Sequence, residues 1–190
     1  MRVKVEWTIP NILTLLRLLA IPVLCFLIWQ WPEHKVKAFV VFLAIWFTDL
    51  LDGYIARHYN METEFGKLFD PLVDKIFQLA TAITMFLINR IPVWVPLYLL
   101  VRELLMVFGS IFVLKNKDLV VHSSLIGKIA TFLFVVAFAA LFWVPSEPRY
   151  IRDLIFLPPV LVSFIATVFY ASRNLFGNRH VHREENAKDA

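Results

Sequence analysis

Residues 49–74 read DLLDGYIARHYNMETEFGKLFDPLVD, a polar stretch that joins two strongly apolar segments. It carries two pairs of aspartates, Asp49 with Asp52 and Asp70 with Asp74. Spacings of three and four residues place both members of a pair on one face of a helix. Two antiparallel helices with a short connection bring such faces together. The sequence therefore predicts a cluster of four carboxylates between consecutive helices, near one end of both.

The chain around this stretch has the composition of a membrane protein. Of its 190 residues 59% are hydrophobic and 18% charged, with a mean hydropathy of +0.69, whereas a soluble domain is about half apolar and a quarter charged. This composition excludes a disordered chain, and a single cysteine excludes a disulfide scaffold. The net charge of +4 is spread through short loops, which indicates lipid head groups and no nucleic-acid partner.

Six stretches approach the roughly 20 apolar residues that a spanning helix needs. They cover about 12–31, 36–54, 68–88, 93–114, 125–144 and 154–176. We expect Pro158 and Pro159 to kink the last span or to delay its start. The predicted fold class is an all-α integral membrane protein with six transmembrane helices and a short N-terminal interfacial segment. Residues 1–176 form the predicted membrane domain, and 177–190 a polar C-terminal tail.

Six spans place both termini on the same side, and basic residues indicate which side. Twelve of the 19 Lys and Arg fall on the side of the termini and five on the other, so the positive-inside rule predicts cytoplasmic termini of a multi-pass protein in the inner (cytoplasmic) cell membrane. Arg17 interrupts the first apolar run. Either its side chain snorkels to the interface, or the first helix lies partly in the interface.

The four aspartates need a counter-charge. An aspartate at mid-span costs about 2.5–3.5 kcal/mol, and repulsion among close carboxylates adds to this cost. A divalent cation offsets both, and carboxylate ligation without His or Cys favours Mg²⁺ or Mn²⁺ over zinc. The alternative is a set of interfacial aspartates paired with Arg57, Lys67 and Lys75.

Small and polar residues accompany the aspartates. Gly53 and Ala56 leave room for a flat group or for close helix approach, and Arg57 follows where it can hold a diphosphate. Gly66 gives backbone freedom before the next helix, and Thr63 offers a hydroxyl. Asn11, just before the first span, is a candidate helix cap.

The pattern D-x2-D-G-x2-A-R-x8-G-x3-D-x3-D is matched at every fixed position, by Asp49, Asp52, Gly53, Ala56, Arg57, Gly66, Asp70 and Asp74. It resembles the CDP-alcohol phosphotransferase family. The opening IPNILTLLR also resembles the usual start of that family, P-N-x-L-T-x-x-R, and the six-helix expectation agrees with its fold.

The resemblance implies transfer of a phosphatidyl group from CDP-diacylglycerol to an alcohol, with release of CMP. It implies two Mg²⁺ or Mn²⁺ ions on Asp49, Asp52, Asp70 and Asp74, the last also acting as the catalytic base. The implied CDP-diacylglycerol site comprises Asn11, Thr14, Arg17, Gly53, Ala56, Arg57, Thr63 and Gly66. The family is often dimeric, so a homodimer is a further expectation.

Two downstream segments bear on the acceptor. LLVRELLM and SSLIGKIAT resemble the phosphatidylglycerophosphate synthase branch, where an arginine and a lysine, here Arg102 and Lys128, help to hold the acceptor phosphate. Ser110 stands where that branch commonly has a second arginine. Glu103 cannot readily face its neighbour Arg102, so we expect it to pair with a cation on another helix.

The expected acceptor is sn-glycerol 3-phosphate, a small phosphorylated alcohol, giving phosphatidylglycerol phosphate in phospholipid biosynthesis. A CDP-alcohol-type cardiolipin synthase, which uses phosphatidylglycerol, is the alternative, and inositol phosphate or serine stays open. A divalent-cation transporter explains the carboxylates but not Arg57, Gly66 or the spacing, and a non-catalytic scaffold explains none of them. Release of CMP distinguishes an enzyme from a transporter.

Overall fold

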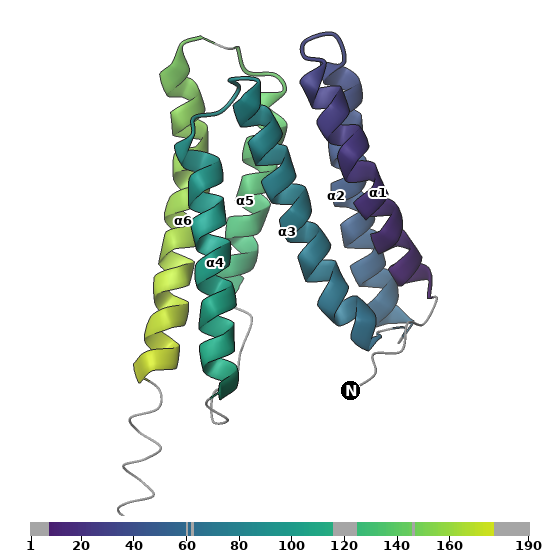
Figure 1. Cartoon of the computed structure of the whole chain (residues 1–190), viewed down its shortest axis with the longest axis vertical. Coiled ribbons are helices and arrows are strands. Elements are labelled where there is room, and N and C mark those ends of the chain that lie inside the picture. Colours follow the sequence, from purple (N-terminus) through teal and green to yellow (C-terminus); the bar gives the residue numbers. More distant parts are fainter. Residues whose placement is uncertain (1–7, 60, 62, 116–124, 146, 177–190) are drawn as a thin grey trace, which may run out of the picture.

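The computed structural model describes residues 8–59, 61, 63–115, 125–145 and 147–176, without the side chains of 68, 108–115 and 170–176. In this part of the chain the regular secondary structure is entirely helical, with no strand (Figure 1). Its helices are α1 (Ile9–Trp29), α2 (Lys35–His58), α3 (Glu64–Leu87), α4 (Trp94–Lys115), α5 (Leu125–Leu141) and α6 (Arg149–Phe176).

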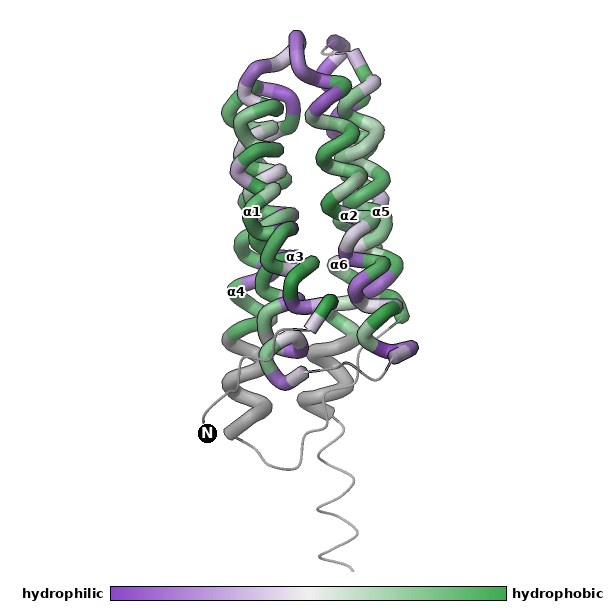
Figure 2. Tube along the Cα trace, turned by 90° about the vertical axis from the view of Figure 1, so that its right-hand side faces the viewer, coloured by the Kyte–Doolittle hydropathy of each residue, from purple (hydrophilic) through white to green (hydrophobic). Residues whose placement is uncertain are grey.

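Three helices of the described chain are long and apolar enough to cross a membrane: α1, α2 and the segment Arg149–Phe169 of α6. Helix α5 is a shorter apolar helix. Large apolar side chains cover the outer faces, as at Leu19, Phe26 and Val40, each more than half exposed. In a soluble monomer such a surface is rare. Figure 2 shows that the middle stretches of the helices consist mainly of hydrophobic residues, with hydrophilic residues gathered toward the ends. The protein is therefore a helical membrane protein.

The helices lie where apolar runs predicted them, but several ends differ. Helices α2 and α3 extend toward each other, so that most of the polar motif is helical. The cause at α3 is its N-cap, because Thr63 Oγ1 accepts a hydrogen bond from the Gly66 amide at 2.9 Å. The predicted delay of the last helix is wrong: α6 begins at Arg149 and contains both prolines. The φ angle of proline suits a helix, so the helix can continue through both prolines although each removes one N–H bond and crowds the carbonyl one turn earlier.

The bundle consists of two groups of helices. Helix α1 packs on α2 and α3, while α5 packs on α6 with α4 beside it, and α3–α4 and α2–α5 contacts join the groups. Figure 1 shows the groups close together at the end that carries the α1–α2, α3–α4 and α5–α6 connections. Toward the other end, where α2 and α3 join, α3 leans away from α4. The aspartates lie toward this second end.

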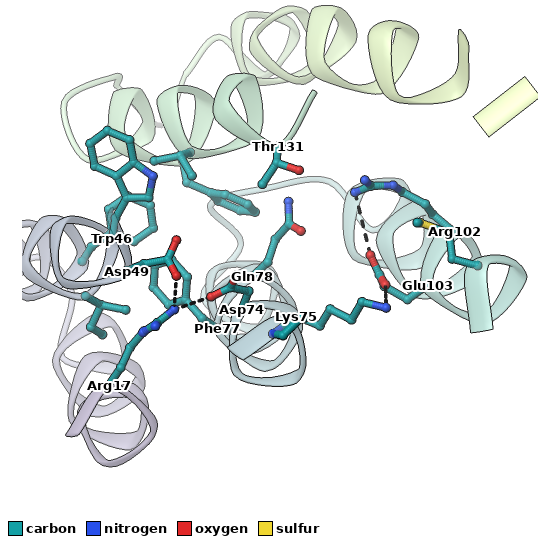
Figure 3. Close-up of a pocket in the computed structure, with 16 residues that line it drawn as sticks. Arg17, Trp46, Asp49, Asp74, Lys75, Phe77, Gln78, Arg102, Glu103 and Thr131 are labelled. Carbon is teal, nitrogen blue, oxygen red and sulfur yellow. Dashed lines mark hydrogen bonds and ion pairs between the residues drawn. The ribbon is translucent and has the colours of Figure 1, made fainter. Parts of the chain in front are cut away.

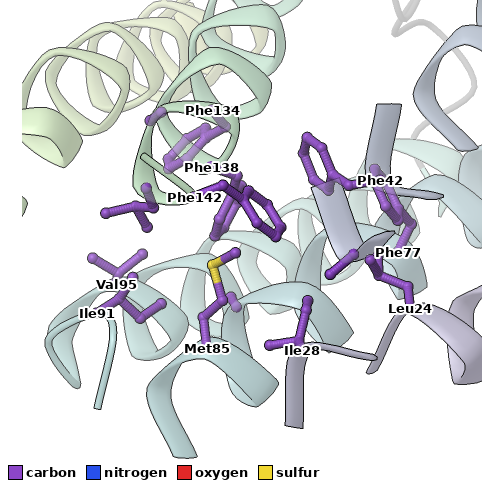
Figure 4. Close-up of a cluster of buried hydrophobic side chains, with 14 of the residues drawn as sticks. Leu24, Ile28, Phe42, Phe77, Met85, Ile91, Val95, Phe134, Phe138 and Phe142 are labelled. Atoms are coloured by element: carbon purple, nitrogen blue, oxygen red, sulfur yellow. The ribbon is translucent and has the colours of Figure 1, made fainter. Parts of the chain in front are cut away.

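Aromatic rings fill the core between the two groups (Figure 4). Phe42 of α2 is 1% exposed and its ring centroid lies 5.2 Å from that of Phe77 on α3. It also lies 5.8 Å from Phe142, directly after α5. Between membrane helices such side chains act through van der Waals packing, and ring pairs add about 0.5–1.5 kcal/mol. This core fixes α2, α3 and α5 around the site.

Candidate functional site

One face of α1 changes from polar to apolar along its length. Its buried residues recur every three or four positions, as a helix face requires: Pro10, Asn11, Thr14, Arg17, Ile21, Leu24 and Ile28. The apolar half packs in the core, and the polar half faces the ends of α2 and α3. The sequence of α1 thus carries three polar side chains to the place where the aspartates gather.

Arg17 lies at the centre of the aspartates and is 2% exposed. Its Nη1 forms ion pairs with Asp49 of α2 and Asp74 of α3, and its Nη2 pairs with Asp52 (Figure 3 shows the first two). The interpretation that Arg17 snorkels to the interface is therefore wrong. Its charge remains at this depth because three carboxylates surround it, and a planar guanidinium can bind several of them at once.

The fourth aspartate is tied to α1 through Thr14. The Thr14 hydroxyl donates to Asp70 Oδ1 at 2.7 Å, and Asp52 Oδ2 lies 3.4 Å away. Two side chains one turn apart on α1 therefore hold all four carboxylates. We call Asp49, Asp52, Asp70 and Asp74 the aspartate cluster. The structure brings together all the carboxylates that the sequence predicted to meet.

The alternative counter-ions do not neutralise this cluster. Lys75 Nζ instead lies 2.8 Å from Glu103 Oε2 on α4, which confirms that Glu103 pairs with a cation of another helix. The contact from Arg102 to Glu103 is longer, at 3.8 Å. Arg57 is exposed and forms no ion pair within the described chain. The cation of the cluster is Arg17.

Asn11, Thr63 and Gly66 form a second contact between α1 and α3. Asn11 is in the first turn of α1 and not its cap, and its Nδ2 donates to Thr63 Oγ1 at 3.0 Å. A Cβ on Gly66 would lie 2.9 Å from Asn11 Oδ1 and 3.1 Å from Thr63 Oγ1. The φ angle of Gly66 is not positive, so the expected backbone freedom is not the reason for glycine. The reason is space for the Asn11 amide.

Gly53 differs from Gly66. The nearest atom to a Cβ built there is Arg57 Nη2, at 3.7 Å, and no atom of another helix lies within 4 Å. Close helix approach therefore does not explain Gly53. The space beside it stays open next to Asp52, with Ala56 and Arg57 on the following turn.

A cavity of about 260 Å³ opens from the aspartate cluster toward the second group of helices. Asp49 and Asp74 lie on one side of it and Arg102 and Glu103 on the other (Figure 3). Its remaining lining residues come from α1, α2, α3, α4 and α5: Arg17, Phe42, Ile45, Trp46, Pro71, Lys75, Phe77, Gln78, Met106, Thr131, Val135 and Phe138. The cavity thus joins carboxylates to a cationic side chain.

The structure separates the two predicted acceptor residues. Arg102 lines the cavity, whereas Lys128 is exposed at the start of α5 and does not line it. The side chain of Ser110 lies outside the described ones. Sequence reasoning missed Gln78, whose amide enters the cavity. It follows Asp74 by four residues, so the helix period could have placed it on the same face.

The cluster offers the ligands that a hard divalent ion prefers. All its members present carboxylate oxygens, with the Thr14 hydroxyl beside them. Within the described part of the chain, no three Asp, Glu, His or Cys side chains are arranged to hold an ion. The physical reason is that three of the carboxylates turn toward the Arg17 guanidinium. The carboxylate oxygens of the cluster are of the kind that Mg²⁺ and Mn²⁺ prefer, and in the structure three of them surround the Arg17 guanidinium.

Comparison with known proteins identifies relatives of the whole chain. The family model described as CDP-alcohol phosphatidyltransferase matches residues 7–171. A probable phosphatidylglycerophosphate synthase of Mycobacterium tuberculosis H37Rv is 34% identical over 171 residues, covering 87% of this chain and 80% of the relative. A CDP-diacylglycerol–glycerol-3-phosphate 3-phosphatidyltransferase of Bacillus subtilis is 31% identical over 71% of this chain and 76% of its own. One of Rickettsia felis with the same name is 38% identical, covering 73% and 76%.

Proposed function

The chain belongs to the CDP-alcohol phosphatidyltransferase family, and we propose that it transfers a phosphatidyl group from CDP-diacylglycerol to sn-glycerol 3-phosphate. The products are phosphatidylglycerol phosphate and CMP. The observation that carries this proposal is the aspartate cluster, gathered beside a cavity that Arg102 lines on its far side. The relatives named for this reaction support the choice of acceptor.

The donor binds at the end of the α1–α2–α3 group that carries the aspartate cluster. The open space beside Gly53 and Ala56 receives the cytidine-diphosphate group. Arg57 Nη2 lies at the edge of this space, 3.7 Å from a Cβ built on Gly53, and can pair with a phosphate oxygen. The Asn11–Thr63 contact, packed over Gly66, fixes α1 against α3 on the other side. Thr14 and Arg17 complete the site from α1. The diacylglycerol tails extend along the apolar outer faces into the membrane.

Asp49, Asp52 and Asp70 would hold the divalent ions, Mg²⁺ or Mn²⁺, and Asp74 would contribute to a second ion. When bound, such ions supply positive charge that neutralises the diphosphate of the donor. The fit rests on the oxygen-only donor set and on the convergence of these carboxylates around a cation in the structure. Arg17, which is bound to three of them, shares this counter-charge with the ions.

Asp74 is the base of the reaction. Its side chain is 46% exposed and lines the cavity, so an acceptor hydroxyl can reach it. Asp74 takes the hydroxyl proton while the hydroxyl oxygen bonds to the lipid-side phosphorus of the donor. The bond from that phosphorus to the bridging oxygen breaks, and CMP leaves with that oxygen. The apolar residues Phe42, Phe77 and Phe138 line the same cavity and limit the access of water.

Arg102 orients the acceptor across the cavity. A guanidinium can donate two parallel hydrogen bonds to a phosphate, and Arg102 faces Asp74 from α4. Lys128 is the second proposed phosphate contact, and from its exposed position it has to approach when the acceptor enters. Glu103 pairs more closely with Lys75, at 2.8 Å, than with Arg102, at 3.8 Å, so Arg102 can turn from this weaker contact to the acceptor phosphate.

The same proposal includes the setting of the enzyme. All six helices cross the cytoplasmic membrane, residues 1–176 form the catalytic domain and a short interfacial segment precedes α1. Both termini are cytoplasmic, because basic residues gather on that side. The chain pairs as a homodimer, as is common in the family.

The test is the identity of the lipid product. Purified protein receives CDP-diacylglycerol with sn-glycerol 3-phosphate or phosphatidylglycerol, separately and in competition, and products are identified by mass. We expect phosphatidylglycerol phosphate from the first acceptor. Cardiolipin formed only from the second would refute this acceptor and establish the cardiolipin synthase alternative.

A further inference from the structure

A second polar site lies at the end of the bundle opposite the aspartate cluster. A cavity of about 510 Å³ opens there, among the connections α1–α2, α3–α4 and α5–α6. We call it the loop-end cavity. Figure 2 shows hydrophilic residues gathered at this end. The residues that line it are Trp31, Phe86, Ile88, Asn89, Arg90, Ile91, Pro92, Val93, Glu147, Arg149, Arg152 and Asp153.

Two of its arginines are buried, which is rare for this residue type. Arg90 is 4% exposed and Arg152 is 7% exposed. Arg90 Nη2 donates to the carbonyls of Leu141 and Val144, at 2.5 and 2.6 Å, and the guanidinium lies 4.7 Å from the centroid of the Trp31 ring. These contacts fix the direction of the Arg90 side chain.

Arg152 has donors without a partner. Its Nη1 donates to the Asn89 carbonyl at 2.5 Å, while Nε and Nη2 donate to no atom of the described chain. No described carboxylate forms an ion pair with Arg152. A buried charge without a counter-ion is costly. Both its charge and its remaining N–H groups can be satisfied by an anion in the cavity that it lines.

The acidic residues of the cavity are engaged elsewhere. Glu147 lies at the exposed rim and accepts from Arg149 Nε at 3.4 Å. Asp153 is exposed and accepts from Trp94 Nε1 at 3.0 Å. The burial of Arg90 and the nearby charge of Arg152 lower the pKa of Arg90 from its ordinary value, which means that the two cations repel each other. An anion between them relieves this repulsion.

We propose that the loop-end cavity binds the phosphate group of a phospholipid, held by Arg152 and attracted by the nearby positive charge of Arg90. A phosphate accepts charge-assisted hydrogen bonds from a guanidinium through two oxygens. Basic pockets between membrane helices can bind lipid head groups, and the connections that line this cavity directly follow or precede the helices of the bundle. This site is independent of the aspartate cluster and of the proposed reaction.

The test compares two lipids that differ only in the phosphate. Phosphatidic acid and diacylglycerol with the same acyl chains are titrated into the detergent-purified protein, and bound lipid is counted by native mass spectrometry. We expect the wild-type protein to bind phosphatidic acid. Arg152→Gln should lower the affinity for phosphatidic acid at least about tenfold, the effect of losing a charged hydrogen bond. Lys37→Gln is the matched control, because Lys37 is an exposed cation at the same end outside the cavity.

Arg152→Lys is the variant least disruptive to folding, since it keeps a cation that can reach the Asn89 carbonyl. It should retain the fold and still weaken phosphatidic acid severalfold. Inorganic phosphate, added together with phosphatidic acid, distinguishes the source of the anion. If it displaces phosphatidic acid at equal concentration, free phosphate is the favoured occupant of the loop-end cavity; if it does not, the lipid is. Equal retention of phosphatidic acid by wild type, Arg152→Gln and Arg152→Lys would overturn the proposal.

Discussion

Replacing Arg17 by Gln removes the cation at the centre of the aspartate cluster and leaves three carboxylates facing one another. The Asp52 side chain is 3% exposed, and loss of one partner from a buried ion pair costs about 3–5 kcal/mol. The side chains of Asp49 and Asp74 are 32% and 46% exposed, so their pairs add only about 0–1 kcal/mol each. The Asp52 pair dominates, and we expect Arg17→Gln to lower the free energy of unfolding by about 3–5 kcal/mol.

Thermal unfolding in detergent, followed by tryptophan fluorescence, measures this loss. For a chain of this size it corresponds to a fall of roughly 6–20 °C in the transition temperature. Arg57→Gln is the control, because Arg57 is exposed and outside any described ion pair, and it should change stability by no more than about 0.5 kcal/mol. Adding Asp52→Asn to Arg17→Gln should recover part of the loss, since it removes one repelling charge. Equal shifts for Arg17→Gln and Arg57→Gln would show that the ion pairs of Arg17 do not stabilise the fold.

Three other substitutions probe the chemistry. Asp74→Asn cannot accept a proton, so kcat should fall by at least about a hundredfold while CDP-diacylglycerol affinity, from equilibrium binding, changes little; a wild-type kcat would exclude Asp74 as the base. Gly66→Ala should weaken CDP-diacylglycerol binding, because the new methyl displaces Asn11 from Thr63. Its stability should stay near that of wild type, since a lost hydrogen bond of about 1 kcal/mol offsets a similar gain in helix propensity; unchanged donor affinity would contradict this role. Arg102→Ala should raise KM for sn-glycerol 3-phosphate about tenfold or more in steady-state assays, and an unaltered KM would remove Arg102 from the acceptor site.

The sequence was sufficient for the helices and for the convergence of the aspartates. Apolar runs set the positions of the helices because membrane-spanning segments must be long and apolar. The i, i+3 and i, i+4 spacings placed the carboxylates on facing sides, and the structure confirms that they meet.

The partner of the aspartates was not predictable from local spacing. Arg17 is 32 residues from Asp49 and 57 from Asp74, so only the packing of α1 against α2 and α3 brings them together. A single arginine in an apolar run is compatible with snorkelling until its neighbours are known. Gly66 is a similar case: its sequence position indicates flexibility, while its surroundings require a small residue.

Release of CMP by the purified enzyme, supplied with CDP-diacylglycerol, sn-glycerol 3-phosphate and Mg²⁺, tests the role of the aspartate cluster most directly. We expect one CMP for each phosphatidylglycerol phosphate formed. We also expect loss of both products after chelation, with recovery on adding Mg²⁺ or Mn²⁺. Asp52→Asn, checked for folding by its thermal transition, should release neither product, whereas Lys37→Gln should match wild type. Undiminished CMP release in a chelator or from Asp52→Asn would contradict the claim that the aspartate cluster carries the reaction.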